Sequence, residues 1–143
     1  MEYVFAADFQ ADPDGGYIVT FPDVPEAITF GDDLTDARSS AAEALGFALR
    51  GYLALDRPLP TPITKRKGLV AIPVSATTAL KLAVVEAFRA SGMSKSDFGR
   101  LLGKAEGEAR RILDPDHPTK VQALEAALAV LGKDIVISVR DAA

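Results

Sequence analysis

Carboxylates near the start of the chain are the residues whose types and spacing could support catalysis. The six residues are Asp8, Asp12, Asp14, Asp23, Asp32 and Asp33. Clustered carboxylates can hold two divalent metal ions and cleave a phosphodiester bond, as in nucleases of the RNase H type. Most of these aspartates stand in turn sequences, where aspartate caps and hydrogen-bonds its own backbone. We therefore expect them to shape turns, and we expect no catalytic residue, metal ion or cofactor.

A second set of charged residues lies within residues 94–113. Ser94 and Asp97 form a pair typical of a helix start, and Gly103 falls where two helices must meet at a sharp angle. The helix expected after this corner turns its apolar residues inward, namely Ala105, Ala109, Ile112 and Leu113. Two short helices joined at such an angle predict a helix-turn-helix.

The charge of the chain is unevenly distributed. Residues 1–64 carry eleven Asp or Glu against three Arg, about −8, while residues 65–143 carry nine against thirteen Lys or Arg, about +4. An acidic module can attract a basic protein, and a basic module can attract phosphate. With no cysteine, no secretory signal and no apolar run near the roughly 20 residues of a membrane span, we expect a cytoplasmic protein without membrane contact.

Turn formers separate three short β-type runs in the first part of the chain. The runs cover 3–7, 17–21 and 27–30, and Asp14-Gly15-Gly16 suits a tight hairpin between the first two. Gly31-Asp32-Asp33 ends the third run and leaves an N-cap for a helix. Across residues 34–55 apolar residues recur every three or four positions, which predicts a helix with one face on the sheet. The sequence predicts an α+β fold with a small N-terminal antiparallel sheet and one packed helix.

A proline-rich segment separates this domain from the rest of the chain. Prolines at alternate positions predict a stiff linker at 57–68, between domains at 1–56 and 69–143. The basic run Lys65-Arg66-Lys67 in the linker fits either a phosphate contact or a solvated loop. The second domain is expected to be helical, with a helix-turn-helix and a terminal strand.

The remaining elements surround the helix-turn-helix. A strand at 69–74 and a helix at 76–90 precede it, and a third helix, capped by Thr119, ends before Gly132. The last run, 135–139, is β-type and has no hairpin partner beside it. Because an unpaired strand is costly, we expect it to pair with 69–74 or with its copy in a second subunit. The second option would place two recognition helices on one palindromic operator.

Three motifs in the N-terminal half resemble the HicB family of type II antitoxins. They are Gly15-Gly16-Tyr17, Thr20-Phe21-Pro22-Asp23-Val24-Pro25 and Thr29-Phe30-Gly31-Asp32, followed by a helix rich in Ala and Glu. One departure is Glu26, where the family commonly has glycine. The resemblance implies a degraded RNase H-like fold that has lost its catalytic carboxylates, and hence a protein that is not an enzyme.

The same resemblance implies a protein partner. The N-terminal domain would bind and mask a small HicA-like ribonuclease toxin, which has the fold of a double-stranded-RNA-binding domain and is therefore basic. Acidic side chains would supply charge complementarity, and aromatic side chains would act as anchors. The expected toxin-binding residues are Asp12, Asp14, Tyr17, Phe21, Asp23, Phe30, Asp32 and Asp33.

The block 94–132 is similar to a phage-repressor (Xre/Cro-type) helix-turn-helix. This similarity implies that the start of the second helix enters the major groove and that the N-terminus of the first lies near phosphates. Lys104 departs from the aliphatic residue usual there, and Glu106 and Glu108 are repelled by phosphate, although glutamate can accept from cytosine N4. The expected DNA-binding residues are Ser94, Lys95, Lys104, Glu106, Gly107, Glu108, Arg110 and Arg111.

The leading hypothesis is an antitoxin that also represses its own operon, as a dimer or tetramer bound to operator DNA. A catalytic nuclease would need carboxylates that converge on strands, and these fall on turns. A stand-alone transcriptional regulator that senses a small ligand is the other alternative. A neighbouring gene for a small basic protein would favour the antitoxin, and its absence would favour the sensor.

Overall fold

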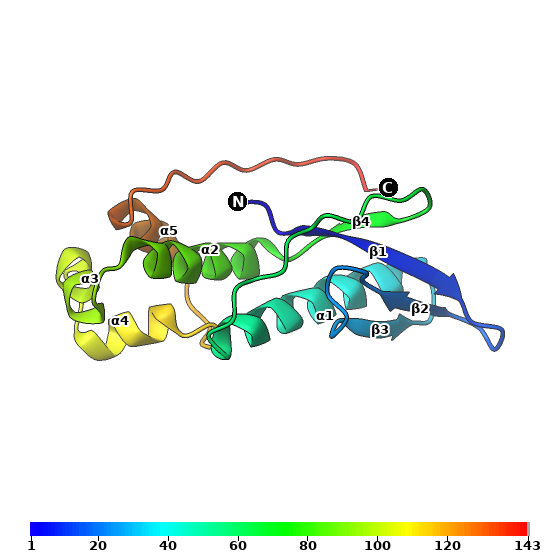
Figure 1. Cartoon of the computed structure of the whole chain (residues 1–143), viewed down its shortest axis with the longest axis horizontal. Coiled ribbons are helices and arrows are strands. Elements are labelled where there is room, and N and C mark those ends of the chain that lie inside the picture. The colour runs from blue at the N-terminus through cyan, green and yellow to red at the C-terminus, as the bar shows by residue number, and fades with distance from the viewer. Residues whose placement is uncertain (143) are drawn as a thin grey trace.

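The computed structural model describes residues 1–142 of the chain. A sheet with one long helix against it forms one end of the molecule, and shorter helices form the other (Figure 1). The elements are β1 (Val4–Ala11), β2 (Tyr17–Thr20), β3 (Ile28–Gly31), α1 (Leu34–Ala54), β4 (Val70–Pro73), α2 (Ala76–Ser91), α3 (Lys95–Leu102), α4 (Glu106–Leu113) and α5 (Val121–Val130). The predicted α+β fold is confirmed.

The sheet is antiparallel throughout and has the strand order β3-β2-β1-β4. The hairpin expected between β1 and β2 is present, and its turn is held by the Asp14 amide, which donates to Asp12 Oδ1 at 2.8 Å. The sheet also contains a strand from beyond the linker, since β4 pairs with β1 and Phe5 lies opposite Ile72. The predicted three-stranded meander is therefore extended to four strands.

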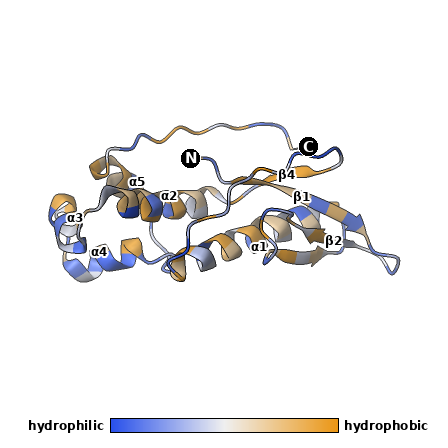
Figure 2. Cartoon of the chain, viewed as in Figure 1, coloured by the Kyte–Doolittle hydropathy of each residue, from blue (hydrophilic) through white to orange (hydrophobic). Residues whose placement is uncertain are grey.

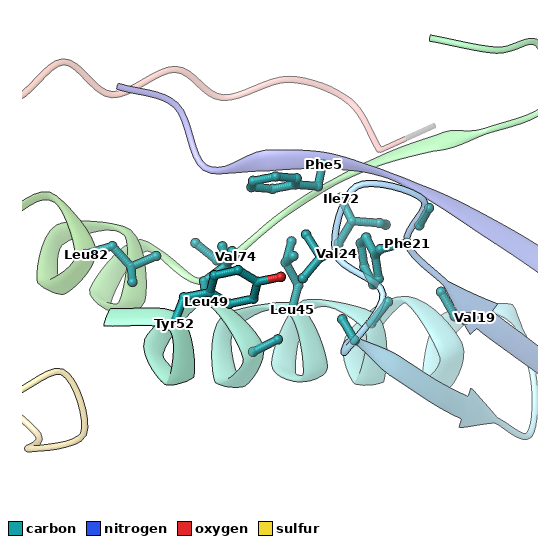
Figure 3. Close-up of a cluster of buried hydrophobic side chains, with 14 of the residues drawn as sticks. Phe5, Val19, Phe21, Val24, Leu45, Leu49, Tyr52, Ile72, Val74 and Leu82 are labelled. Carbon is teal, nitrogen blue, oxygen red and sulfur yellow. The ribbon is translucent and has the colours of Figure 1, made fainter. Parts of the chain in front are cut away.

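Helix α1 covers the inner face of the sheet. It begins where the Asp33 side chain accepts a hydrogen bond from the Asp36 amide at 2.8 Å, which is the cap that the sequence predicts. Its small residues let it approach β3 so closely that a Cβ on Gly31 would lie 2.3 Å from the Ala37 nitrogen. Larger side chains fill the space between α1, β1 and β4, as Figure 3 shows for Phe5, Leu45, Leu49 and Ile72.

Helix α2 belongs to two hydrophobic cores. Leu82 and Val85 are buried with the sheet and α1, whereas Val84 and Ala87 are buried with the helices that follow. Since residues 84 and 87 lie on one face and 82 and 85 on another, the helix is covered from two sides. Figure 1 shows α2 lying between the two ends of the molecule.

The linker lies against the first core. The Thr64 amide and hydroxyl both donate to the Asp23 carboxylate, at 2.9 and 2.5 Å, and Leu59 packs on the core. The Arg57 guanidinium lies over the Tyr52 ring, 4.3 Å from its centroid. These contacts fix both ends of the segment that the sequence describes only as a stiff spacer.

The run 135–139 is not a strand in this chain. Residues 133–142 form no helix or strand, and in Figure 1 they run from the end of α5 toward the side of the molecule that carries β4. Pairing with 69–74 is wrong, because β4 takes β1 as its partner and remains the edge of the sheet. Over the described residues, no helix combines the length and apolar character needed to cross a bilayer.

The close approach of α1 to β3 predicts opposite effects for two glycine substitutions. Gly31→Ala places a methyl group against the backbone of Ala37 and should lower the free energy of unfolding by about 1–3 kcal/mol. Gly51→Ala, in α1 with nothing within 4 Å of the added Cβ, should raise it by about 1 kcal/mol. Urea unfolding of both variants checks this; equal effects would contradict the packing described here.

Candidate functional site

Helices α3 and α4, over which the sequence predicts a helix-turn-helix, are joined by a short turn. Ser94 caps α3, and its hydroxyl accepts from the Asp97 amide at 3.1 Å, as the sequence predicts. Gly103 has φ of 67°, a left-handed conformation that glycine adopts without strain, and it ends α3. The Lys104 amide donates to Gly99 O at 3.0 Å and closes the turn. The predicted corner at Gly103 is confirmed.

Helix α4 has one buried face and one charged exposed face. Ala109, Ile112 and Leu113 are buried against α2, α3 and α5. The opposite face consists of five exposed residues that the sequence predicts for DNA contact, namely Glu106, Gly107, Glu108, Arg110 and Arg111. In Figure 2 this helix is largely hydrophilic along its exposed side. The fold thus brings these five residues together on one surface, with Lys95 exposed at the start of α3.

Two ion pairs, one from the preceding turn and one within the helix, offset the two carboxylates of α4. Arg110 Nη2 lies 2.9 Å from Glu106 Oε1, and Lys104 Nζ lies 3.2 Å from Glu108 Oε1. Both are exposed or half-exposed pairs four residues apart, which stabilise a helix by a few tenths of a kcal/mol. Their larger effect here is on the surface potential, because each glutamate that would repel phosphate lies beside a cation.

A buried lysine that the sequence analysis did not single out holds the C-terminal end of α4. Lys81 of α2 is 4% exposed. Its ammonium donates to Arg111 O at 3.2 Å, Ile112 O at 2.9 Å and the Thr119 hydroxyl at 2.6 Å. A cation at a helix C-terminus is favourable because the last carbonyls lack partners within the helix. Lys81 therefore fixes the position of the exposed helix relative to α2.

The prediction that Thr119 caps the third helix is wrong, because its hydroxyl is bound by Lys81. Helix α5 begins after Lys120 without a side-chain cap, and the Thr119 hydroxyl instead accepts from Lys81. The spacing of the sequence does indicate that Lys81 is buried. It precedes Val84 and Phe88 by three and seven positions and so shares with them the helix face that packs on the second core. A lysine on such a face needs acceptors, but only the fold shows which ones.

The outer face of the sheet, away from α1, carries exposed apolar side chains. Phe30 of β3 lies opposite Ile18 of β2, and Ile28 lies opposite Thr20 on the same face. Ile28 is 64% exposed and Phe30 is 46% exposed. The Phe30 ring lies against Gly16, where an added Cβ would be 2.3 Å away. We call Ile18, Ile28 and Phe30 the outer apolar patch; sequence analysis named Phe30 and missed the two isoleucines.

The aspartates predicted for a partner serve different purposes. Asp12 and Asp14 lie at the tip of the β1–β2 hairpin, beyond the outer apolar patch. Asp33 caps α1, the Asp32 amide donates to Asp36 Oδ2 at 2.8 Å, and Asp23 accepts from Thr64. The hairpin tip and Asp32–Asp33 are exposed or half-exposed, while Asp23 is engaged by the linker.

Two predicted aromatic anchors differ from Phe30 in burial. Phe21 is 2% exposed and lies in the first core, beside Val24 and Leu45 (Figure 3). It cannot contact a partner while the domain is folded, so its assignment to a binding surface is wrong. Tyr17 is half-buried and packs against the same core. Alternation from Val19 to Phe21 places both side chains on the inner face, so the period of two along this run was the signal that Phe21 belongs to the core.

No group of three or more His, Cys, Asp or Glu within residues 1–142 is arranged to hold a metal ion. The aspartates at the turns accept hydrogen bonds from backbone amides or from Thr64. This is the turn chemistry expected from the sequence.

Comparison with known proteins defines the class of protein. Residues 4–83, which contain the whole sheet, α1 and half of α2, match the family described as the HicB-like antitoxin of bacterial toxin-antitoxin systems. The chain is 34% identical to Antitoxin HicB of Escherichia coli (strain K12) over 125 residues, 86% of this chain and 89% of that protein. It is 37% identical to Antitoxin HicB 2 of Photorhabdus laumondii over 120 residues, 84% of this chain and 85% of that protein.

A third relative extends the similarity over nearly the full length. Antitoxin HicB of Pseudomonas fluorescens is 29% identical over 141 residues, which is 98% of this chain and 96% of that protein. The chain therefore belongs to the HicB-like family of antitoxins.

The environment of Lys81 predicts a pH-dependent contribution to stability. Burial lowers the pKa of Lys81 from 10.5 to about 8, and nearby Asp114 partly opposes this shift. Between these values the unfolded chain binds more protons than the folded protein, so this group makes the free energy of unfolding rise with pH. In Lys81→Met this contribution to the rise in the free energy of unfolding is absent, and Arg111 O and Ile112 O lose the ammonium as a donor.

Urea unfolding from pH 7 to 10.5 measures this difference. The native protein should be more stable than Lys81→Met at pH 7 by about 1–2 kcal/mol, and the gap should widen with pH by at most about 3 kcal/mol. The raised pKa values of Tyr3 and Tyr52 act in the opposite direction, but they are common to both proteins and cancel in the gap. If the difference in the free energy of unfolding between the native protein and Lys81→Met narrows as the pH rises, the buried position of the ammonium is contradicted.

Proposed function

We propose that this protein binds and masks a small, basic, HicA-like ribonuclease toxin and represses its own operon through the helix-turn-helix. The observation that carries the first part is the outer apolar patch, which is exposed beside an acidic hairpin tip. Family membership supports the antitoxin role. The protein acts in the cytoplasm, where messenger RNA and operator DNA are both accessible.

The surface of the N-terminal domain fits a cationic protein. A protein that binds RNA needs positive charge, and residues 1–64 carry a net charge of about −8. Exposed apolar groups rimmed by charge are typical of protein-binding surfaces, with aromatic anchors near the centre and charge that speeds association. Phe30 supplies the anchor, and Asp12, Asp14, Asp32 and Asp33 supply the charge.

The exposed face of α4 fits duplex DNA. Arg110 and Arg111 lie one helical turn from Glu106, Gly107 and Glu108, so base contacts at the start of the helix and phosphate contacts further along are compatible. Because Glu106 and Glu108 are paired with cations, the helix retains its attraction for phosphate. Two copies are required for a palindromic operator, which supports a dimer or tetramer as the binding species.

The antitoxin function requires no catalysis by this chain. The Asp12 carboxylate holds a turn, Asp33 caps α1 and Asp23 is held by the linker, whereas Asp8 lies on β1 and accepts a hydrogen bond from Gln10. Magnesium-dependent cleavage of an RNA/DNA hybrid that is lost on changing Asp8 and Asp12 would revive the nuclease hypothesis.

Charge reversal at the hairpin tip should weaken toxin binding. Asp14→Lys keeps the turn, because the hydrogen bond uses the Asp14 amide and the Asp12 carboxylate. We expect Asp14→Lys together with Ile28→Ala to reduce affinity for the cognate toxin by about tenfold or more, mainly by losing charge complementarity and apolar contact. Calorimetric titration with the protein encoded by the neighbouring gene measures this.

The matched control is Glu125→Lys, the same change of charge on the exposed side of α5. It should leave toxin affinity within about twofold. If the two lysine substitutions weaken binding equally, net charge rather than the sheet surface governs the association, and the proposed surface is incorrect.

Removing the arginines of α4 should separate the two activities. Arg110→Ala with Arg111→Ala should lower operator affinity by about tenfold or more and reduce its salt dependence, while rescue of growth from the toxin is retained. Arg66→Ala, in the basic run of the linker, is measured beside it: little effect on either activity fits a solvated loop there, and a loss of operator affinity fits a phosphate contact. Fluorescence anisotropy with operator DNA and a growth-rescue assay provide the readouts; loss of rescue in a folded variant would show that the activities are not separate.

A ligand-sensing regulator is a second candidate because of a groove beside α1. The groove has a volume of about 760 Å³ and is lined by residues that include Ser40, Phe47, Arg50 and Thr78. Arg50 Nε is buried and lacks a hydrogen-bond partner within the described part of the chain. Because Arg50 lines the groove, its positive charge would favour a small anionic ligand there. The absence of a neighbouring gene for a small basic protein would favour this candidate over the antitoxin.

A further inference from the structure

The sheet has an unprotected edge at β3. The strand order β3-β2-β1-β4 leaves β3 at the margin opposite β4, paired on one side only within the part of the chain that the structure describes (Figure 1). Native proteins protect such an edge with a proline, a charged residue or a bulge. Residues 28–31 contain neither proline nor charge, and their register with β2 is continuous, whereas β4 ends with Pro73. The edge of β3 is therefore one that another strand can join.

The backbone groups of Ile28 and Phe30 point outward at this edge. The Asp12 amide donates to Gly16 O, so the pair of residues 12 and 16 is hydrogen-bonded at the end of the β1–β2 hairpin. Bonded and non-bonded pairs alternate along antiparallel strands, and counting from this pair leaves residues 28 and 30 without bonds to β2. The amide and carbonyl groups of Ile28 and Phe30 are thus available to an incoming strand.

A groove continues the inner side of the same edge. It is lined by Thr29 of β3 and by residues of α1 that include Ser40, Glu43 and Phe47. Thr29 lies opposite Val19, which is buried on the inner face, so Thr29 points toward α1. A residue that paired with Thr29 from an added strand would point to this side and enter the groove. Its two neighbours would point to the other side and extend the outer apolar patch.

The charge of the groove differs between its two ends. Gly31 touches Ala37, and α1 runs back along β3 from this contact (Figure 1). Glu43 therefore lies nearer to Thr29 than Arg50 does, since Arg50 follows it by seven residues, about 10 Å along the helix. The end of the groove beside β3 thus favours a cationic side chain.

The charges around the edge also disfavour a second copy of the chain. Asp32 follows β3 directly, and Glu26 precedes it by two residues. Two copies of β3 paired with Ile28 opposite Phe30 would bring Asp32 of each copy toward Glu26 of the other. Like charges that face each other across strands destabilise a sheet, and opposite charges stabilise it. A strand that carries lysine or arginine is the better partner.

We propose that an extended segment of the cationic toxin joins the sheet at β3 as a fifth strand, with one basic side chain in the groove beside Glu43. Strand addition of this kind derives affinity from main-chain hydrogen bonds and specificity from pockets for alternate side chains. This inference rests on the proposed function, because it specifies how the toxin is held. The basic residue is the one that pairs with Thr29.

Proline substitution separates main-chain pairing from side-chain contact. Ile28→Pro removes an outward amide but no bond to β2, and proline is tolerated at the first residue of a strand. Ile28→Ala removes the same side chain and retains the amide. We expect Ile28→Pro to bind the toxin at least about tenfold more weakly than Ile28→Ala, because a carbonyl of the incoming strand loses its donor. Calorimetric titration of the full chain with the protein encoded by the neighbouring gene measures both affinities.

The matched control is Ala71→Pro, at the opposite edge. The Val74 amide donates to Tyr3 O, so the same alternation turns the Ala71 amide away from β1. This variant also loses an outward amide, and its toxin affinity should stay within about twofold of the native value. If Ala71→Pro and Ile28→Pro weaken binding equally, proline acts by disturbing the sheet, and strand addition at β3 is excluded.

Amide hydrogen exchange in the native protein needs no substitution. The amides of Ile28 and Phe30 should exchange rapidly in the protein alone and at least about a hundredfold more slowly in the toxin complex, while the Ala71 amide stays fast. Slow exchange of the first two amides without toxin, lost on dilution, would identify a second copy as the occupant and overturn the proposal.

The remaining outcomes distinguish this inference from the proposed function. If the toxin binds the native protein but Ile28→Pro is no weaker than Ile28→Ala, or if exchange at Ile28 and Phe30 is unchanged in the complex, strand addition is wrong and the antitoxin function stands. If the native protein binds no toxin at all, both are wrong.

Discussion

The burial of α2 on two sides is the constraint on which the rest of the structure depends. Leu82 and Val85 complete the core beneath the sheet, and Val84 and Ala87 complete the core shared with the C-terminal helices α3, α4 and α5. Polar contacts reinforce the first attachment, since the Tyr3 hydroxyl donates to Glu86 Oε1 at 2.6 Å and Arg89 Nη2 donates to Leu53 O at 2.5 Å. Separating the two halves would expose one face of α2 to water, which is unfavourable. The sheet and the C-terminal helices are therefore held in one orientation.

This rigidity limits how occupancy of one half can influence the other. A conformational route needs two arrangements of comparable free energy, each with a different affinity for a ligand. A helix buried in two cores and anchored by Lys81 at one of them favours a single arrangement. Under the proposed function, a bound toxin would therefore act on operator binding through its own volume and charge beside the DNA, or through the number of DNA-binding units that it holds together.

Local signals in the sequence predicted what depends on a few neighbouring residues. Asp14 with the two glycines, the caps Asp33 and Ser94, and the corner at Gly103 are all found where expected, because each acts within one turn of chain. What the sequence did not reveal depends on distant partners. The strand β4 finds β1 across about 65 residues, and Lys81 finds acceptors about 30 residues away. The periodicity of apolar residues predicts that one face of a helix or strand is buried, but it does not identify the element that covers this face.

The departure at Glu26 shows how carboxylates in a turn hold distant parts of this chain together. Glu26 accepts a hydrogen bond from the Tyr52 hydroxyl at 2.6 Å, which lowers its pKa, and the Tyr52 ring carries the Arg57 guanidinium on its face. Asp23, three residues earlier, holds Thr64 at the far end of the linker. Two carboxylates in the turn between β2 and β3 thus fix both ends of the linker. The linker can then deliver β4 to the open edge of β1, and the fourth strand leads directly into the helix that both cores share.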